Sequence, residues 1–245
     1  MDCRTTQEVN RTAPELFDSE NLKYWQHRYD VGDTYWMRQE AAPMLVKHYM
    51  KLNPDKKARN ILLPLCGKSW DLDWLSEQDV PLVVGIDCLL GVLREFSNRS
   101  GHIWTETAVP KLGSDSVLLK RNDGKMKLYS CDMLDFSPEI EGTFDAVWER
   151  GSLIILPRES VNRYVQILVS LLRSGGRILL ESIEFDADAI DPGTEYKPFP
   201  PFPYFQEDIK HLFEPECIVE ALERWPCQWK YGEKTDLVIY LITKN

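Results

Sequence analysis

The feature that most constrains this chain is an apolar run that enters a glycine turn at residues 61–68. Residues 61–65 have the pattern of a buried strand, Gly67 that of a tight turn, and the residues after it that of a helix start. A second apolar run, 82–86, ends at Asp87, 20 residues after Gly67. This layout predicts one βαβ unit whose second strand is closed by an acidic residue, the arrangement that holds the ribose of an adenosine-type cofactor.

The turn also limits which cofactor fits. Gly67 has no Cβ, so backbone N–H groups and a ligand could come close, and the Asp87 carboxylate could accept bonds from two ribose hydroxyls. A glycine that merely turns the chain is the alternative interpretation. The three-glycine dinucleotide fingerprint is absent, because Lys68-Ser69-Trp70 follow Gly67. This disfavours a bound pyrophosphate and a nicotinamide dehydrogenase, and favours an adenosine cofactor without phosphate, such as S-adenosylmethionine.

The size and charge of the chain narrow the class of partner. Its 245 residues suffice for one α/β domain over 1–245, and its 43% hydrophobic and 28% charged residues are ordinary for a globular protein. The formal net charge is -10. Nucleic-acid binders need a basic surface, and anionic membranes would repel this one. We therefore expect a small-molecule partner, with no nucleic acid and no membrane.

The cysteines indicate a reducing compartment. The six cysteines form no C-x-x-C pair and no metal-ligand spacing with the four histidines, so we expect reduced thiols, no metal ion and a cytoplasmic protein. No apolar run reaches the roughly 20 residues needed to span a bilayer. We also expect no signal peptide, because no apolar segment follows a basic one in residues 1–6. With no coiled-coil pattern and no apolar stripe, we expect a monomer.

The residues before the first predicted strand differ from the rest of the chain. Residues 1 to about 15 are polar, and we expect them to be flexible. Residues 16–52 contain helix-start chemistry and predict one helix over about 20–30 and another that begins near Pro43. We interpret 16–52 as an N-terminal helical lid.

Three large aromatic residues lie in this lid. Trp25 and Tyr29 are four residues apart and share a face of the first helix, and Trp36 follows that helix. One interpretation is that the rings fasten the helical layer to the sheet edge. The other is that they cover a cofactor, because a sulfonium cation sits favourably on aromatic faces. Both interpretations can hold together.

The remaining chain alternates between strands and helices and closes with an antiparallel pair. The expected strands are about 60–65, 82–87, 117–119, 126–129, 144–148, 177–183, 217–225 and 236–242. The expected helices are about 69–78, 89–98, 157–173 and 206–213. Asn122-Asp123-Gly124 predicts a hairpin, and Gly175-Gly176 predicts the end of the third of these helices. Nothing indicates a second domain.

Asp132 directly follows the return strand of the predicted hairpin, where open α/β sheets place ligand contacts. Its carboxylate could accept a hydrogen bond from the exocyclic amine of an adenine, while the apolar Met133 packs on the ring. The alternative interpretation is an exposed loop acid without a ligand.

Residues 186–205 combine five prolines with five aromatic residues, Phe202 among them. Proline lowers the entropy cost of ordering a loop, and polar linkers rarely carry so many rings. We interpret the segment as a semi-rigid substrate flap over an apolar pocket. A loop that only covers a sheet edge is the alternative.

Taken together, these patterns resemble the thiopurine S-methyltransferase family over nearly the whole chain. The motifs that carry the resemblance are Trp25-Gln26-x-x-Tyr29-x-x-Gly32-x-Thr34-x-Trp36, Leu63-Pro64-Leu65-Cys66-Gly67-Lys68, Val84-Gly85-Ile86-Asp87, Phe144-Asp145-x-x-Trp148-Glu149-Arg150-Gly151-Ser152-Leu153 and Pro200-Pro201-Phe202. The resemblance implies a single-domain, Rossmann-like class I methyltransferase fold of the α/β class. Its sheet would have seven strands, mostly parallel, with an antiparallel C-terminal hairpin and helices on both faces.

The resemblance also implies two overlapping sets of site residues. The cofactor-binding set is Trp25, Tyr29, Trp36, Leu65, Gly67, Asp87, Asp132, Met133 and Arg150. The substrate-side set is Trp36, Arg150 and Phe202. Asp87 stands where the family usually has a glutamate, which is one methylene longer but offers the same two acceptors. Near Arg224 no second substrate-side arginine can be assigned.

The implied reaction moves the methyl group of S-adenosylmethionine to the sulfur of a small aromatic or heterocyclic thiol and leaves S-adenosylhomocysteine. An aromatic thiol ionises near neutral pH, so a general base is not required. Arg150 is a candidate for stabilising the thiolate, or else a member of a structural ion pair. The competing functions are a methyltransferase of the same fold acting on a selenium or tellurium species, a carboxylate or an amine, and a non-catalytic cofactor-binding module that regulates a partner.

Overall fold

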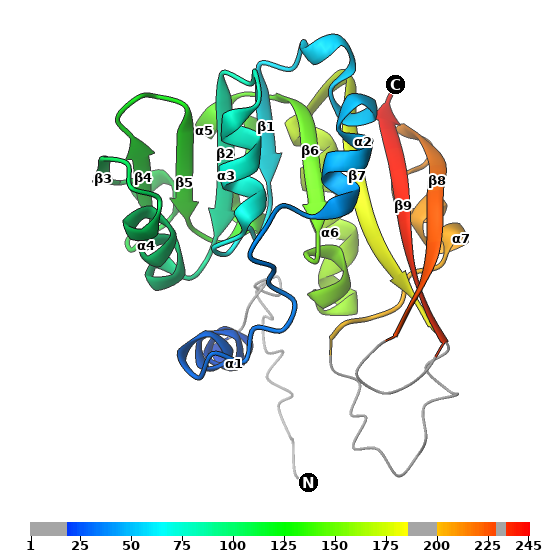
Figure 1. Ribbon diagram of the computed structural model, residues 1–245, viewed down its shortest axis with the longest axis horizontal. Coiled ribbons are helices and arrows are strands. Elements are labelled where there is room, and N and C mark those ends of the chain that lie inside the picture. The colour runs from blue at the N-terminus through cyan, green and yellow to red at the C-terminus, as the bar shows by residue number, and fades with distance from the viewer. Residues whose placement is uncertain (1–18, 186–199, 229–233) are drawn as a thin grey trace, which may run out of the picture.

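The computed structural model describes residues 19–185, 200–228 and 234–245. They form one twisted sheet with helices packed against it, and the N-terminal helix lies across one end of the strands (Figure 1). Residues 1–15, which we expected to be flexible, lie outside the described residues, and so do residues 186–199, which are most of the predicted flap.

The bounds of the elements are as follows. The strands are β1 Asn60–Leu63, β2 Leu82–Asp87, β3 Trp104–Ala108, β4 Val117–Arg121, β5 Met126–Ser130, β6 Phe144–Arg150, β7 Leu172–Glu184, β8 Cys217–Gln228 and β9 Lys234–Lys244. The α-helices are α1 Ser19–Asp30, α2 Pro43–Leu52, α3 Trp70–Glu77, α4 Leu90–Arg99, α5 Pro138–Glu141, α6 Arg158–Leu171 and α7 Gln206–Phe213. The 3₁₀ turns are η1 Pro54–Lys56, η2 Pro110–Leu112, η3 Met133–Asp135 and η4 Leu153–Ile155.

The sheet has the order β3-β4-β5-β2-β1-β6-β7-β9-β8. Its five central strands, from β5 to β7, are parallel, and β8 and β9 form the expected antiparallel C-terminal hairpin. Within the described residues, only β4 and β9 run against the other strands. The predicted α/β class and the mostly parallel sheet are therefore confirmed.

The described residues form a sheet of nine strands, whereas the family resemblance implied seven and the apolar pattern predicted eight. The turn at residues 122–124 returns the chain as a hairpin, as predicted, and β4 pairs on its outer side with β3. β3 has the sequence Trp-Thr-Glu-Thr-Ala, and all its residues after Trp104 are exposed. It lacks the buried face that makes a strand visible in a hydrophobic pattern, and so no strand was expected there.

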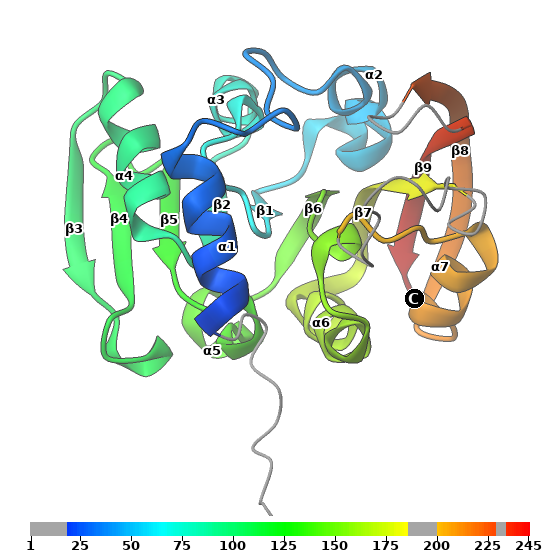
Figure 2. The same ribbon diagram turned by 90° about the horizontal axis from the view of Figure 1, so that it is seen from below.

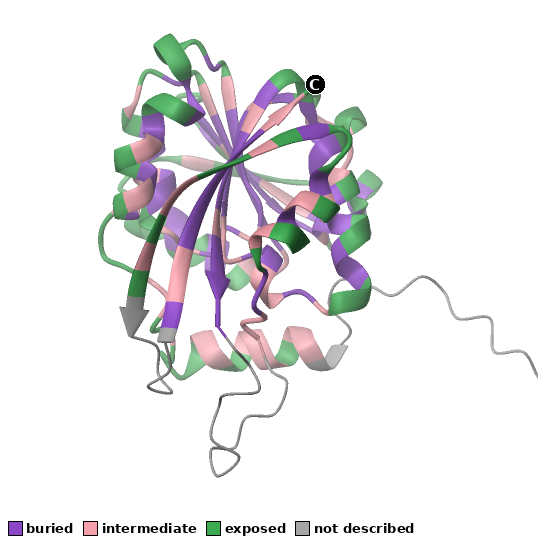
Figure 3. Cartoon of the chain, turned by 90° about the vertical axis from the view of Figure 1, so that its right-hand side faces the viewer, coloured by how far each residue is buried: buried purple, intermediate pink, exposed green. Residues whose placement is uncertain are grey.

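The two faces of the sheet are covered by different helices. α6 and α7 pack on one face, where Tyr164 and Phe213 are buried. α2, α3 and α4 pack on the other, where Leu45, Leu72 and Phe96 are completely buried. Figure 2 shows α2 and α3 on the opposite side of the sheet from α6 and α7. Buried residues line the strands and the inward sides of the helices (Figure 3), so helices on both faces are confirmed.

One predicted boundary is wrong. Gly175-Gly176 does not end α6, because that helix stops at Leu171 and Leu172 already pairs with Phe144 of β6. Both glycines lie within β7, where the ladder is irregular and Gly175 has a φ of +70°. Pairing with β6 resumes only at Arg177, so the strand has a bulge at the residues that local propensity assigns to a turn.

Gly85, at the centre of the sheet, allows a test of how tightly these layers pack. A Cβ on Gly85 of β2 would lie 2.7 Å from Cys66 Sγ and 2.8 Å from a Leu128 methyl carbon. We predict that Gly85→Ala lowers the free energy of unfolding by about 1–3 kcal/mol, since overpacking forces the neighbours apart. Gly91→Ala is the matched control, because Gly91 is exposed on α4 and a Cβ there would point into open space. Urea unfolding with equal effects of both changes would contradict this packing.

Candidate functional site

Four predicted site residues meet at one edge of the sheet. The carboxyl ends of β1, β2, β5 and β6 lie side by side, because these strands are parallel and adjacent in the sheet order. Gly67 follows β1, Asp87 ends β2, Asp132 follows β5 and Arg150 ends β6. α1 lies across this end of the strands (Figures 1 and 2). Open α/β sheets bind their ligands at such an edge.

The carboxylate of Asp87 joins the glycine turn to the second strand. Its Oδ2 accepts a hydrogen bond from Gly67 N at 2.8 Å, and its Oδ1 accepts one from Leu89 N at 2.9 Å. The residue is 8% exposed. Burial raises the pKa of Asp87, while backbone N–H groups of Leu89, Gly67 and Cys88 act in the opposite direction. Gly67 has a φ of +51°, a conformation in which glycine avoids the strain that a side chain would bring.

Aromatic residues of the N-terminal segment cover this turn. A Cβ on Gly67 would overlap the hydroxyl of Tyr29, so the ring lies directly on the turn. The ring of Trp36 meets those of Trp25 and Tyr29 edge to face, with centroids 5.5 and 5.9 Å away. Burial, and then the nearby charge of Asp87, raise the pKa of Tyr29.

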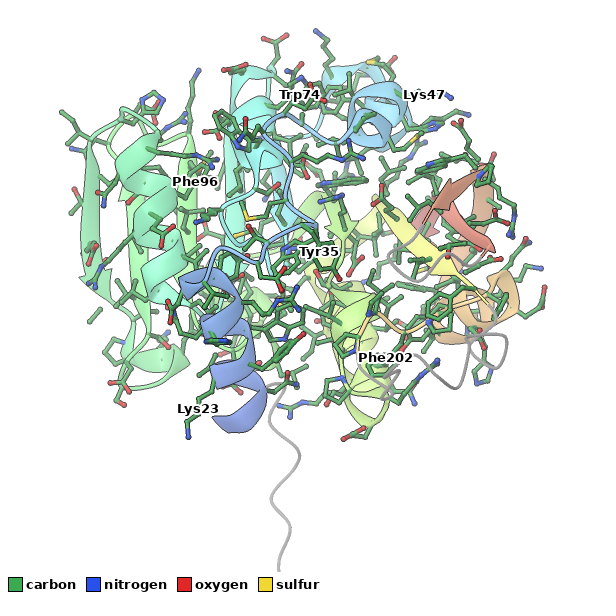
Figure 4. The ribbon with its side chains drawn as sticks, turned by 60° about the horizontal axis from the view of Figure 1, so that its bottom comes forward. Lys23, Tyr35, Lys47, Trp74, Phe96 and Phe202 are labelled. Atoms are coloured by element: carbon green, nitrogen blue, oxygen red, sulfur yellow. The ribbon has the colours of Figure 1, made fainter. Side chains whose placement is uncertain are left out.

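Arg28 holds this aromatic cluster together. Its Nε lies 3.0 Å from Asp33 Oδ2 and donates to the Asp33 carbonyl at 3.1 Å. Its guanidinium carbon lies 4.9 Å from the Trp36 ring centroid and 5.4 Å from that of Tyr35, within the range of cation–π contacts. Figure 4 shows Tyr35 over the carboxyl-end side of the sheet. Arg28 therefore fastens α1 to the loop that carries Trp36.

A pocket lies between this loop, the glycine turn and the end of β6. Its lining residues are Tyr29, Trp36, Met37, Arg38, Glu40, Leu63, Pro64, Leu65, Cys66, Lys68, Ser69, Asp71, Trp148 and Arg150. Arg150 Nε bonds Glu181 at 3.1 Å, and its Nη2 donates to the carbonyl of Trp36 at 3.2 Å. Arg150 is thus both a member of an ion pair and a tie to the N-terminal loop.

The structure brings only some of the predicted residues into the pocket lining. Tyr29, Trp36, Leu65 and Arg150 line it together. The other predicted site residues adjoin it or lie farther along the sheet edge, and they are Trp25, Gly67, Asp87, Asp132, Met133 and Phe202.

Asp132 and Met133 lie at the start of η3. Asp132 is half-buried, and its Oδ1 accepts from Leu134 N at 2.8 Å, so it caps this turn. Met133 is 1% exposed and packs in the core. The carboxylate of Asp132 also acts on Cys88, because burial and then the charges of Asp87 and Asp132 raise the pKa of that thiol. The charges of both predicted acids therefore act on the same thiol.

Phe202 lies on the α6 side of this edge (Figure 4). Its backbone N donates to the carbonyl of Ile154 at 2.6 Å, and the guanidinium of Arg158 lies 5.7 Å from its ring centroid. The remaining aromatic residues of the predicted flap that precede it, Tyr196 and Phe199, lie outside the described residues.

The sequence model of the thiopurine S-methyltransferase family matches residues 20–235. The chain belongs to this family. A probable thiopurine S-methyltransferase from Danio rerio is 31% identical over 231 residues, which cover 92% of this chain and 96% of that protein. The thiopurine S-methyltransferase of Equus caballus is 28% identical over 203 residues, 83% of this chain and 79% of its own.

Solved structures show the same fold at low identity. The 1,6-didemethyltoxoflavin-N1-methyltransferase of Burkholderia thailandensis, with bound 1,6-didemethyltoxoflavin and S-adenosylhomocysteine, aligns over 99% of both chains with a TM-score of 0.59 and 14% identity. The N-methyltransferase NodS of Bradyrhizobium japonicum, in complex with S-adenosylhomocysteine, aligns over 91% of this chain and 97% of its own with a TM-score of 0.60 and 15% identity. This member of the thiopurine S-methyltransferase family therefore has the fold of S-adenosylmethionine-dependent methyltransferases.

The described residues were also compared with the requirements of a membrane span and of a metal site. None of their helices combines the length and apolar character needed to cross a membrane. No group of three or more His, Cys, Asp or Glu side chains among them is arranged to hold a metal ion.

Asp71 is a site residue that the sequence patterns did not reveal. It is 3% exposed at the start of α3. Its Oδ1 accepts from Ala42 N at 2.6 Å, and its Oδ2 accepts from Trp148 Nε1 at 2.9 Å. It therefore ties the end of the N-terminal segment to β6 across the pocket. An acid in the first turn of a helix is usually a solvated capping residue, so its burial was not visible in the sequence.

Glu149 is a second missed residue, and it is completely buried on the other face of β6. Its Oε1 accepts from Leu153 N at 2.6 Å and from the hydroxyl of Tyr164 at 2.9 Å. Its Oε2 has no hydrogen-bond partner among the described residues. Burial raises the pKa of Glu149 to about 7, and the charge of Glu181 adds to the shift.

This pKa makes a prediction about stability. The folded state binds the Glu149 proton more tightly than the unfolded chain does, so the free energy of unfolding falls as pH rises from about 4.5 to about 7. The fall from this one group is roughly 3 kcal/mol. The side chain in Glu149→Gln cannot titrate. We therefore predict that the free energy of unfolding of this variant, relative to that of the wild type, rises by about that amount from pH 5 to pH 8. Urea unfolding across this range measures it.

Glu220→Gln on β8 is the matched control, because this glutamate is exposed and hydrated in both states. The free energy of unfolding of this control should change with pH in the same way as that of the wild type over this range. Parallel curves for Glu149→Gln as well would show that the Glu149 carboxyl is not buried in the way described.

Proposed function

We propose that this protein is an S-adenosylmethionine-dependent S-methyltransferase that acts on small aromatic or heterocyclic thiols. The observation that carries the proposal is the joint lining of one pocket by Tyr29, Trp36, Leu65 and Arg150 next to the Asp87-bound glycine turn. Family membership supports it, as do the neighbours of the same fold that hold S-adenosylhomocysteine. We further propose a cytoplasmic monomer of one domain, with residues 16–52 as its lid, whose partners are small molecules.

The residues at the sheet edge fit the proposed cofactor. Each oxygen of Asp87 accepts one backbone N–H, which leaves acceptor capacity for two ribose hydroxyls. The buried indole N–H of Trp25 has no acceptor among the described residues, so it can donate to a ligand. We assign Asp132 and the adjoining Met133, whose side chain is buried in the core, to the adenine end of the site, and Leu65 to the methionine part. When bound, S-adenosylmethionine supplies a methyl group that is activated by its positive sulfur.

We assign an arginine and two aromatic residues to the acceptor side of the proposed site. Arg150 approaches from β6 and Trp36 from the N-terminal loop, while Phe202 comes from the segment before α7. The guanidinium of Arg150 can stabilise a thiolate without gaining or losing a proton. The aromatic residues align a planar acceptor and exclude water, and alignment is the main contribution a protein can make to a displacement at an activated methyl group.

The direct test is methylation of an acceptor panel with radiolabelled S-adenosylmethionine, followed by mass spectrometry of the products. The panel holds aromatic and heterocyclic thiols, aliphatic thiols, selenols, carboxylates and amines. We expect methylation at the sulfur of aromatic thiols above all other acceptors. Robust transfer only to other acceptors would refute the thiol assignment. Binding of the cofactor without transfer to any acceptor would identify a regulatory module instead.

Asp87→Ala tests the cofactor side. Loss of a charged acceptor for the ribose should weaken the binding of S-adenosylhomocysteine by roughly 1–3 kcal/mol, about 10- to 100-fold. Isothermal titration calorimetry measures the change on protein shown to be folded by circular dichroism. Asp79→Ala, at an exposed acid that pairs with Lys56, should leave the affinity unchanged. Unchanged affinity for folded Asp87→Ala would remove this residue from the site.

Trp36→Ala tests the acceptor side. Trp36 lines the pocket at its boundary with the N-terminal loop, so its removal should change the ratios of kcat/KM among the acceptor thiols more than the stability of the fold. Trp70→Ala is the control, because Trp70 stacks on Arg99 outside the pocket lining. Identical ratios for Trp36→Ala and the wild type would assign Trp36 to packing alone.

A further inference from the structure

The turn that follows Arg150 contacts both sides of the proposed site. Ser152 Oγ donates to the carbonyl of Pro64 at 2.9 Å, in the turn that leads to Gly67. The carbonyl of Ile154 accepts from Phe202 N at 2.6 Å. Ser152 and Leu153 are 1% and 0% exposed. Residues 152–154, which we call the β6 exit turn, therefore bridge the cofactor side and the acceptor side.

This exit turn is anchored from the opposite face of the sheet. Side chains alternate along a strand, so Trp148 and Arg150 line the pocket while Glu149 points towards α6, where it meets Tyr164. Glu149 Oε1 accepts from Leu153 N, the amide in the middle of the exit turn. Glu149 itself never reaches the pocket.

The environment of Glu149 shows that its carboxylate is not there for an ion pair. The polar groups bonded to it are the Tyr164 hydroxyl from α6 and the Leu153 amide of the exit turn, and the charge of Glu181 on β7 acts on it from the other face of the sheet. None of these is a cation, and Oε2 has no partner among the described residues. A buried carboxyl in such a place costs free energy that an apolar side chain would not. The carboxyl therefore needs another explanation, and its bond to Leu153 N supplies one.

We propose that Glu149 is a positioning residue that fixes the β6 exit turn and thereby places Phe202 against the acceptor. The proposal rests on the proposed function, because it assigns Phe202 to the acceptor wall. It also predicts which side is affected. The glycine turn keeps a second tie, from Gly67 N to Asp87, so removal of Glu149 should disturb the acceptor more than the cofactor.

Two neighbours of Phe202 are held independently of the exit turn. Pro203 O accepts from Arg158 Nη2 at 3.1 Å, and Tyr204 N donates to Ile183 O at 3.0 Å. The effect of Glu149 should therefore be confined to Phe202 and should not spread to α7.

The kinetic test uses three variants of the full chain with an aromatic thiol as acceptor. Glu149→Leu removes the acceptor of the Leu153 amide and should raise KM for the thiol about tenfold, the size expected for one lost hydrogen bond of about 1.4 kcal/mol. The dissociation constant of S-adenosylhomocysteine should stay within about twofold. Glu149→Gln keeps a carbonyl oxygen for the amide and should restore the thiol KM. Tyr164→Phe removes only the other donor to Oε1 and should leave the thiol KM unchanged.

A second readout does not depend on turnover. Hydrogen exchange followed by NMR should show faster exchange of the Leu153 and Phe202 amides in Glu149→Leu, with no such change in Tyr164→Phe. In the wild type the two amides should open with the same free energy, since one bonded turn holds both. This comparison needs no variant, and so a failure of Glu149→Leu to fold leaves it intact.

The outcomes separate the two proposals. A protein that methylates no thiol refutes the proposed function, while linked exchange of Leu153 and Phe202 would still support the role of Glu149 in fixing the turn. Unchanged thiol KM in folded Glu149→Leu, or a KM equally raised in Glu149→Gln, would overturn the positioning role. Independent exchange of the two amides in the wild type would overturn it as well.

Discussion

The site depends on one buried carboxylate. Asp87 ends β2 and accepts backbone N–H groups with both oxygens, one from the glycine turn after β1 and one from the start of α4. A buried acid is tolerated when it is bonded in this way, because hydrogen bonds replace the lost hydration. The bond from Gly67 N also fixes the turn on which Tyr29 lies, and Tyr29 contacts Trp36. The position of the N-terminal lid over the site therefore depends on Asp87, through Gly67 and Tyr29.

Strand β6 divides two tasks between its faces. Trp148 and Arg150 point into the pocket, where they meet Asp71 and the carbonyl of Trp36. Glu149 lies between them in sequence and points to the opposite layer, beneath α6. The two faces meet again at the turn after β6, which bonds both the glycine turn and the segment of Phe202. Through this strand, packing under α6 can act on a pocket that α6 does not line.

The elements predicted correctly from the sequence are those whose signal is local. The apolar runs that became β1 and β2, the turn at residues 122–124 and the helix from Gln206 to Phe213 each carry their own pattern. The position of Asp87 at the end of β2 was predicted in the same way, because a strand that ends in an acid is visible in the sequence. β3 was missed because its exposed residues show no alternation.

The missed site residues are those whose role depends on neighbours distant in the chain. Asp71 bonds Ala42 and Trp148, 29 and 77 residues away. Arg28 contacts the rings of Tyr35 and Trp36 only after the chain has folded back on α1, so its role cannot be predicted from local sequence. The burial of Glu149 was not predicted, because nothing in the local sequence distinguishes a buried glutamate from an exposed one. Tertiary contact, and not propensity, assigns these three residues.

The most direct test of this account is a crystal structure of the full chain with S-adenosylhomocysteine. We predict that the ribose hydroxyls lie within about 2.6–3.2 Å of the Asp87 carboxylate, under the rings of Tyr29 and Trp36. A nucleoside bound elsewhere, with Asp87 bonded to backbone amides alone, would contradict it.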